Sequence, residues 1–267
     1  MAFIIVCIML ESKDSDRLDP PVNISKDHSQ KDAISSLTLQ IDRLNQYRSH
    51  IFDREDIGIP QKGTNMHPSP KLASVLLLLR HNNSPDCSLC PWDVLLTLRT
   101  SQMRSHRGVV CLPGGKLESG ETAAAGALRE AQEEVGLNPD DVQVVGEYGA
   151  TQTTNNQLVY TVIAVLKNEK ITFRANPSEV EDTFWMPLIV CHRAENHRES
   201  DEYGFLFHYF DYRPPDSQHI YTVWGLTARL LMATANAIVG SLPEYVIPGR
   251  KFMTRDPLYL GFISAKL

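Results

Sequence analysis

Three glutamates in one short segment could bind a metal ion. Glu130, Glu133 and Glu134 stand at positions i, i+3 and i+4, which are neighbours on the surface of a helix. Like charges at an i,i+4 spacing destabilise a helix by about 0.2–0.5 kcal/mol per pair, so the cluster is costly unless a positive group lies beside it. Carboxylate oxygens are the ligands that hard divalent cations prefer. The spacing alone leaves two interpretations open, a cation site and a solvated acidic face.

The surrounding residues predict the helix that would carry these glutamates. Apolar residues recur at helical spacing and form a narrow stripe on another face, made of Ala124, Ala127, Leu128, Ala131 and Val135. The small alanines would let this helix lie close to a sheet. Gly120 precedes the helix, and Gly136 stands where a left-handed C-terminal cap is expected.

The order of the flanking residues resembles the motif of a known family. Gly115 is followed after five residues by Glu121, and after seven more by residues 129–137, REAQEEVGL. This order resembles the Nudix box, G-x5-E-x7-R-E-U-x-E-E-x-G-U, in which U is an aliphatic residue, and every fixed position is present. The resemblance implies an α/β protein with the Nudix fold, an α/β/α sandwich with a mixed central β-sheet. It also implies hydrolysis of a nucleoside diphosphate linked to another moiety.

The resemblance implies a role for each charged position of the motif. Glu130 and Glu134 would coordinate Mg²⁺ or Mn²⁺, and Glu133 would be a further ligand or the base for the attacking water. Arg129 would orient the carboxylates through charge-assisted hydrogen bonds, and Glu121 would brace the junction of loop and helix. Metal ions neutralise pyrophosphate oxygens and lower the pKa of bound water, so no covalent enzyme intermediate is expected.

A basic stretch directly precedes the acidic segment. No acidic residue occurs from Val94 to Leu117, while Arg99, Arg104, Arg107 and Lys116 give a charge of +4. The simplest physical account is a polyanionic substrate held by the basic half while its metal is held by the acidic half. The alternative is a set of basic residues that are merely solvated on a loop.

This stretch resembles the additional motif of the coenzyme A pyrophosphatase branch of Nudix enzymes, L-L-T-x-R-S/A-x3-R-x3-G-x3-F-P-G-G. The matching positions are Leu95, Leu96, Thr97, Arg99, Arg104, Gly108, Pro113, Gly114 and Gly115. Thr100 replaces the small Ser or Ala, and Leu112 replaces Phe. Residues 178–188 and 223–228 resemble later segments of the branch, E-V-x-x-x-F-x-x-P-L and W-G-L-T-A.

This second resemblance implies a substrate and the residues that bind it. Arg99, Arg104 and His106 would contact the substrate, with a structural histidine as the alternative for His106. Glu179 would be an additional metal-site carboxylate or base, or else an ordinary surface residue. The branch splits coenzyme A (CoA), its acyl esters or oxidised CoA into 3',5'-ADP and (acyl-)4'-phosphopantetheine. Hydrolysis of NADH, ADP-ribose or another nucleoside diphosphate derivative is one alternative, and a catalytically silent Nudix-fold binding module is another.

The rest of the chain predicts mixed α and β structure. Short apolar runs bounded by loop residues predict strands over 73–79, 93–98, 142–145, 159–166 and 183–185. A helix is expected over 221–238, with Val223 on its apolar face and Trp224 in the core. Cys87 and Cys90 form a single C-x-x-C pair, which is a weak zinc signal without a second pair, and two loop cysteines are the alternative.

Three segments are predicted along the chain. Residues 1–70 form an N-terminal extension with one amphipathic helix over 31–50, and residues 71–240 form the Nudix domain. Residues 241–267 form a tail ending in Ala265-Lys266-Leu267, which is similar to the S-K-L peroxisomal signal. Together with the CoA motif, this ending predicts a peroxisomal enzyme that is recognised by the peroxisomal import receptor.

Composition argues against several classes of protein. A net charge of −6 does not suit a general nucleic-acid binder, which needs a basic face. Five cysteines, an odd number, do not suggest a disulfide framework and favour a reducing compartment. Residues 2–10 are apolar, but a bilayer span takes about 20 apolar residues, and a cleaved secretory signal is the weaker alternative. We expect no nucleic-acid partner and no membrane span.

Overall fold

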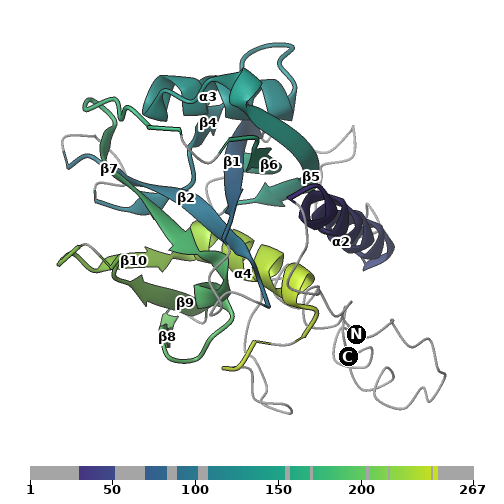
Figure 1. Ribbon diagram of the computed structural model, residues 1–267, viewed down its shortest axis with the longest axis vertical. Coiled ribbons are helices and arrows are strands. Elements are labelled where there is room, and N and C mark those ends of the chain that lie inside the picture. Colours follow the sequence, from purple (N-terminus) through teal and green to yellow (C-terminus); the bar gives the residue numbers. More distant parts are fainter. Residues whose placement is uncertain are drawn as a thin grey trace, which may run out of the picture.

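The structure is a computed structural model of the 267-residue chain. It describes residues 30–51, 70–82, 89–101, 108–153, 157–168, 171–202, 205–215, 217–241 and 243–245. In these residues a large mixed sheet lies between helices, and a smaller antiparallel sheet lies below it in Figure 1.

Seven strands form the larger sheet: β1 Lys71–His81, β2 Trp92–Arg99, β3 Val110–Cys111, β4 Gly114–Lys116, β5 Val142–Gln152, β6 Gln157–Leu166 and β7 Val180–Pro187. The main order is β3-β2-β1-β6-β5, with β4 paired to β1 and β7 paired to β2. β1 and β6 are parallel, from Lys71 opposite Gln157 to Leu79 opposite Val165, and the other pairs are antiparallel. The sheet is therefore mixed, and the five strands expected from the sequence all lie in it.

The helices and the second sheet complete the described part. The helices are α2 Gln30–Ile51, α3 Ala123–Val135 and α4 Gly225–Val239, with short 3₁₀ helices η2 Pro139–Asp141 and η3 Leu188–Cys191. The small sheet has the order β10-β9-β8 and consists of β8 His197–Glu202, β9 Phe205–Tyr212 and β10 Tyr221–Trp224. No helix in the described ranges is both long and apolar enough to cross a membrane.

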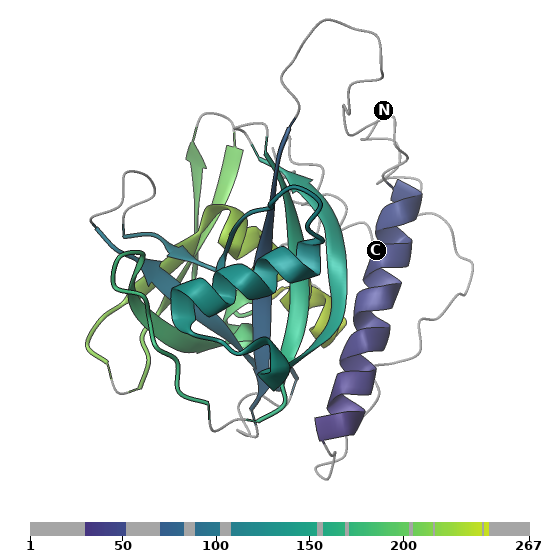
Figure 2. The same ribbon diagram turned by 90° about the horizontal axis from the view of Figure 1, so that it is seen from above.

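The leucine run of β1 is buried on both faces of the larger sheet. Leu76 and Leu78 belong to the core that lies under α3. Leu77 and Leu79 belong to the core on the other side, which they share with α2 and α4. Because side chains alternate along a strand, a strand covered on both faces reads as a continuous apolar run. Helices on both faces make the α/β/α sandwich that the resemblance implied (Figures 1 and 2).

The helix expected over 221–238 begins later than predicted. Its first four residues form β10, in which Tyr221 lies opposite Tyr212 of β9. Gly225 then has a φ of 63°, which lies outside the right-handed helical region, and α4 follows. Trp224 is not a core residue, because it is 39% exposed and stacks on Tyr209. Val223 is buried, but as a strand residue. A strand that runs directly into a helix led to both errors.

α2 packs against the larger sheet and α4. Leu37 and Ile41 are buried on its inner face. Ile41 lies against Gly146 of β5, where an added Cβ would come within 2.8 Å of Ile41 Cγ2. Gln40 Nε2 donates a hydrogen bond to the carbonyl oxygen of Ile238 in α4 at 3.2 Å. The helix expected over 31–50 is therefore present and contributes to the core. Figure 2 shows α2, in purple, beside the sheet. The division of the chain at residues 70 and 240 stays a prediction.

Only one cysteine of the C-x-x-C pair lies within the described residues. Cys87 lies outside the described residues. Cys90 is fully buried in the core that includes Leu77 and Leu79. Cys90 lies in the irregular segment just before β2, and its side chain fills space in the core.

Candidate active site

A short loop connects Gly115, the first residue of the Nudix-box motif, to helix α3 and its glutamates. Thr122 caps the helix, since its side chain accepts a hydrogen bond from the N–H of Ala125 at 3.2 Å. At the other end Gly136 has a φ of 70° and its N–H bonds to carbonyls of the last turn, which confirms the predicted cap. A Cβ at Gly126 would collide with the Leu117 side chain, so the helix lies directly on the preceding loop.

The three glutamates of α3 differ in burial, and helix geometry explains the order. Their side chains are 3% exposed at Glu134, 17% at Glu130 and 57% at Glu133. Successive residues turn by about 100° around a helix, so these side chains point about 60°, 100° and 160° away from buried Ala131. Glu134 therefore faces the sheet, while Glu133 faces solvent.

Arg129 connects the loop to the carboxylates of the helix. Its Nε and Nη2 atoms donate to the two oxygens of Glu121 at 3.0 and 3.2 Å. Nη1 donates to Glu130 at 3.1 Å and to Glu133 at 3.4 Å. Nη2 also donates to the carbonyl oxygen of Lys116 at 3.0 Å. The hydrogen bond from Arg129 is the largest cause that lowers the pKa of Glu121. These contacts hold Glu121 at the junction of loop and helix, while its role in catalysis stays a prediction.

The Glu134 carboxylate is buried against β4. Its Oε2 atom accepts a hydrogen bond from the N–H of Gly114 at 3.1 Å, and Oε1 lies 3.6 Å from Arg99 Nη1. Gly114 has a φ of 154°, and a Cβ there would collide with the backbone of Ser74 and Val75, so the position requires glycine. Burial is the main cause that raises the pKa of Glu134 to about 7, and the Gly114 hydrogen bond and Arg99 oppose this effect.

Glu130 lies over the next glycine of the loop. A Cβ at Gly115 would collide with the carboxylate of Glu130, so this carboxylate occupies the space beside the backbone. Burial raises the pKa of Glu130, and Arg129 opposes the shift. Consecutive glycines thus let Glu130 and Glu134 both approach the backbone of β4.

A fourth carboxylate, Glu179, acts on the same two side chains. Its negative charge contributes to the raised pKa of both Glu130 and Glu134. Its position depends on backbone hydrogen bonds from Asn176 N to Glu134 O at 2.8 Å and from Glu179 N to Asn176 O at 3.0 Å. Thr100 N also donates to Glu179 O at 3.0 Å. The role of Glu179 at the site stays a prediction.

Sequence reasoning missed the turn that positions Glu179. The side-chain oxygen of Asn176 accepts hydrogen bonds from the backbone N–H of Ser178 at 3.2 Å and from its hydroxyl at 2.7 Å. This is the arrangement in which an asparagine side chain closes a turn two residues ahead. The Asn-Pro-Ser sequence at 176–178 is the signal that could have predicted it.

The carboxylates at β4 form a donor set for a hard cation. Glu130 and Glu134 could supply oxygen ligands, the kind that Mg²⁺ and Mn²⁺ prefer. Burial and mutual repulsion disfavour the charged form of Glu130 and Glu134, and a bound cation would reverse that effect. Within the described residues, no three of Glu130, Glu133, Glu134 and Glu179 form a group whose ligand atoms all lie within 4.8 Å of one another. Neither the triplet that the helical spacing suggested nor the set that includes Glu179 is compact.

The basic stretch meets this site through Arg99. Arg99 ends β2 and lies beside Glu134. Its N–H donates to Val109 O at 3.1 Å, and its carbonyl accepts from Gly108 N at 3.1 Å. Thr100 and Gly108 thus both lie next to Arg99. Arg104 and His106 lie between them in sequence, outside the described residues, so their predicted contacts with substrate stay predictions.

Comparison with known proteins matches the same region. The NUDIX domain profile matches residues 71–222. The chain is 36% identical to Nudix hydrolase 15, mitochondrial, of Arabidopsis thaliana over 68% of this chain and 64% of that protein. It is 34% identical to Peroxisomal coenzyme A diphosphatase ndx-8 of Caenorhabditis elegans over 66% of this chain and 73% of that protein. It is 33% identical to Peroxisomal coenzyme A diphosphatase NUDT7 of Mus musculus over 58% of this chain and 67% of that protein.

A glycine loop followed by an acidic helix, on a mixed sheet covered by helices on both faces, defines a protein of the Nudix class. The matching profile covers more than half of the chain, and the chain belongs to the Nudix family. The match spans less than two thirds of two Arabidopsis relatives, 64% of the mitochondrial protein and 63% of the chloroplastic Nudix hydrolase 22.

The space at Gly115 yields a test of the cation site. We expect Gly115→Ala to weaken Mn²⁺ binding about 10–100-fold, because the new Cβ displaces the Glu130 carboxylate. Titration of the purified chain with Mn²⁺, followed by electron paramagnetic resonance, measures this affinity. Gly149→Ala is the matched control, since a Cβ there meets nothing within 4 Å. Equal affinities in the two variants would contradict a role for Glu130 as a ligand.

Proposed function

We propose that this protein is a Nudix diphosphatase that hydrolyses the diphosphate bond of CoA and its acyl or oxidised derivatives. The products would be 3',5'-ADP and (acyl-)4'-phosphopantetheine. The observation that carries the proposal is the 3.6 Å approach of the Arg99 guanidinium to the buried carboxylate of Glu134. One side of the site suits a cation and the other suits a phosphate. The motif around Arg99 and the names of two relatives support CoA as the substrate.

Each charged residue then has a distinct task. Glu130 and Glu134 would hold Mg²⁺ or Mn²⁺, which supplies charge neutralisation at the phosphates and a lower pKa for bound water. Arg129 would keep the Glu130 carboxylate in place through the 3.1 Å hydrogen bond, while Glu121 anchors Arg129 to the loop. Arg99 would donate hydrogen bonds to substrate phosphate oxygens, and we propose that Arg104 and His106 assist from the adjoining loop.

Two carboxylates compete for the role of general base. Glu133 is the more exposed, and its 3.4 Å contact with Arg129 leaves most of its carboxylate open to water. We propose Glu133 as the base or as a further ligand of the metal. Glu179 is the rival, because its charge already acts on both Glu130 and Glu134.

Substitution of the two candidates distinguishes them. We expect Glu133→Gln to lower kcat for CoA by about 100-fold or more with little change in KM, because loss of a positioned base slows the chemical step. Glu181→Gln is the control, since Glu181 is an exposed carboxylate two residues beyond Glu179. Steady-state assays of Glu133→Gln, Glu179→Gln and Glu181→Gln measure the three effects. A large loss in Glu179→Gln with unchanged turnover in Glu133→Gln would assign the base to Glu179.

A nucleotide panel tests the reaction and the substrate together. We expect release of 3',5'-ADP from CoA to exceed release of AMP from NADH at equal concentration, as measured by liquid chromatography. Chelation should abolish turnover, and Mg²⁺ or Mn²⁺ should restore it, because the carboxylates alone cannot neutralise the phosphates. Faster hydrolysis of NADH or ADP-ribose would favour that substrate class. Absence of hydrolysis across the panel would favour a silent binding module.

We also propose that the enzyme works in peroxisomes, where the import receptor would bind Ala265-Lys266-Leu267. Two relatives carry peroxisomal names, whereas two others are called mitochondrial and chloroplastic. The tripeptide lies outside the described residues. The full chain with a fluorescent protein at its N-terminus should colocalise with a peroxisomal marker. Removal of Lys266 and Leu267 should leave it in the cytosol with its activity intact, and continued import would contradict the assignment.

A further inference from the structure

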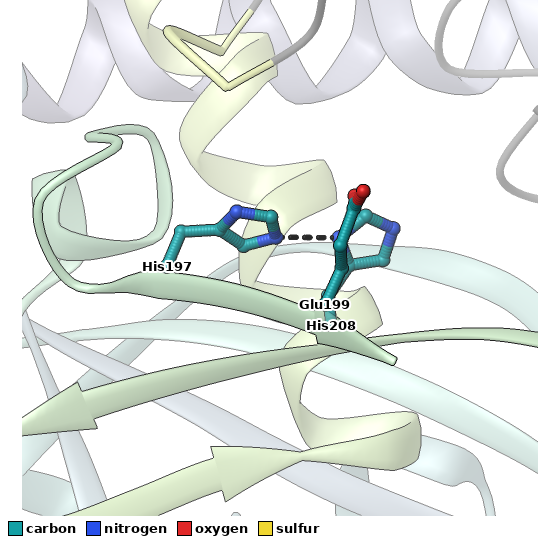
Figure 3. A group of neighbouring side chains, drawn as sticks. All are labelled: His197, Glu199 and His208. Carbon is teal, nitrogen blue, oxygen red and sulfur yellow. Dashed lines mark hydrogen bonds between the residues drawn. The ribbon is translucent and has the colours of Figure 1, made fainter. Parts of the chain in front are cut away.

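A second group of metal-binding side chains lies on the small sheet. His197 and Glu199 are two residues apart on β8, so they share one face of the strand. His208 of β9 is paired directly with Glu199, which places it on the same face. One ligand atom from each of the three residues lies within 4.8 Å of the others. Figure 3 shows these side chains together, and in Figure 1 β8 lies at the opposite end of the molecule from α3.

The two imidazoles already face each other with the atoms that would bind a metal. His197 Nε2 lies 2.7 Å from His208 Nδ1 (Figure 3). One hydrogen is shared between them, so one ring donates and the other accepts. Zinc–nitrogen bonds of about 2.0–2.1 Å at a tetrahedral angle would place two such nitrogens about 3.4 Å apart. A small rotation of the rings opens the present contact to that separation.

The surroundings fix the rings in this orientation. His197 stacks on Tyr245, with ring centroids 3.8 Å apart and planes at 16°. Tyr245 is itself anchored, because its hydroxyl donates to the carbonyl oxygen of Cys191 at 2.7 Å. His208 is buried, whereas His197 and Glu199 are half-buried, which leaves an entry path for an ion. Rings that are held by packing in advance lose little freedom when they bind a metal.

We propose that His197, Glu199 and His208 form a Zn²⁺ site that joins β8 to β9. Two imidazole nitrogens and one carboxylate oxygen are a donor set that zinc binds well, whereas Mg²⁺ prefers oxygen ligands alone. Three protein ligands leave a fourth position for water. When the metal binds, the ring that donated the shared hydrogen changes tautomer, so its hydrogen moves to the ring nitrogen that faces away from the metal. Both facing nitrogens then offer lone pairs, and the two rings together lose no proton. The proposal is independent of the reaction proposed at α3.

Zinc titration of the full chain tests the site. The protein is stripped with a chelator, freed of the chelator, and titrated with Zn²⁺ in excess Mg²⁺ by isothermal calorimetry. The same titration on Glu134→Gln keeps the α3 site from contributing. We expect one zinc per chain in both proteins, together with a rise in Tm on zinc addition, because an ion that binds only the folded state stabilises it.

Variants at the small sheet identify the ligands. His197→Ala and Glu199→Gln should each weaken zinc binding by about 100-fold or more and remove the rise in Tm, since each deletes one of three protein ligands. His219→Ala, at an exposed histidine, is the matched control and should bind like the natural chain. Glu199→Gln preserves the shape of the side chain, so it gives an answer even if His197→Ala does not fold.

Three kinds of result would overturn the proposal. The first is zinc affinity that is unchanged in Glu199→Gln or that disappears in Glu134→Gln. The second is an absence of zinc uptake at micromolar concentration by the natural chain, which would make the two histidines a hydrogen-bonded pair only. X-ray absorption of the zinc-loaded chain should show two imidazoles, and a spectrum with oxygen ligands alone would also contradict the site.

Discussion

The burial of a carboxylate beside the backbone of β4 is the constraint on which the active-site region depends. Removal of a charged group from water costs free energy unless hydrogen bonds or opposite charges compensate. Glu134 obtains a backbone N–H from Gly114 and a guanidinium from Arg99, yet its pKa remains raised to about 7. The compensation is incomplete within the protein itself. This is the electrostatic environment that a bound cation would complete.

The close contact between α3 and the sheet follows from small residues. Ala127 and Ala131 are fully buried on the side of α3 that faces the sheet, and side chains of this size let the helix axis approach the strands. That approach brings the Glu134 carboxylate to the Gly114 amide. Arg129 then joins the solvent side of the helix to the loop, with Glu121 as its main partner. Packing on one side of α3 and hydrogen bonding on the other therefore fix the helix in the same position.

The sequence predicted the parts of this structure that depend on local spacing. Five strands of the larger sheet and the cap at Gly136 could be inferred, because each leaves a periodic or compositional signal. The mixed sheet followed only from the resemblance to the Nudix family. The small sheet could not be predicted, because polar and apolar residues alternate only weakly along its strands. Trp224 was misassigned because a strand and a helix join without a loop. The electrostatic effect of Glu179 on Glu130 was beyond spacing arguments, since Glu179 follows a turn nearly fifty residues downstream of Glu130.

The geometry of the site finally depends on how two strands end. Leu95 faces the core under α3, and alternation along β2 carries Arg99 to that same side, where it meets Glu134. β7 pairs with β2, and a register shift after Leu98 sets Arg99 opposite Val180. Glu179 immediately precedes Val180, and its carbonyl oxygen accepts a hydrogen bond from Thr100 N at 3.0 Å, so its backbone lies beside the end of β2 that carries Arg99. Arg99 at the end of β2 lies 3.6 Å from Glu134 of α3, and through this pair the basic and acidic stretches that adjoin in the sequence meet in the fold.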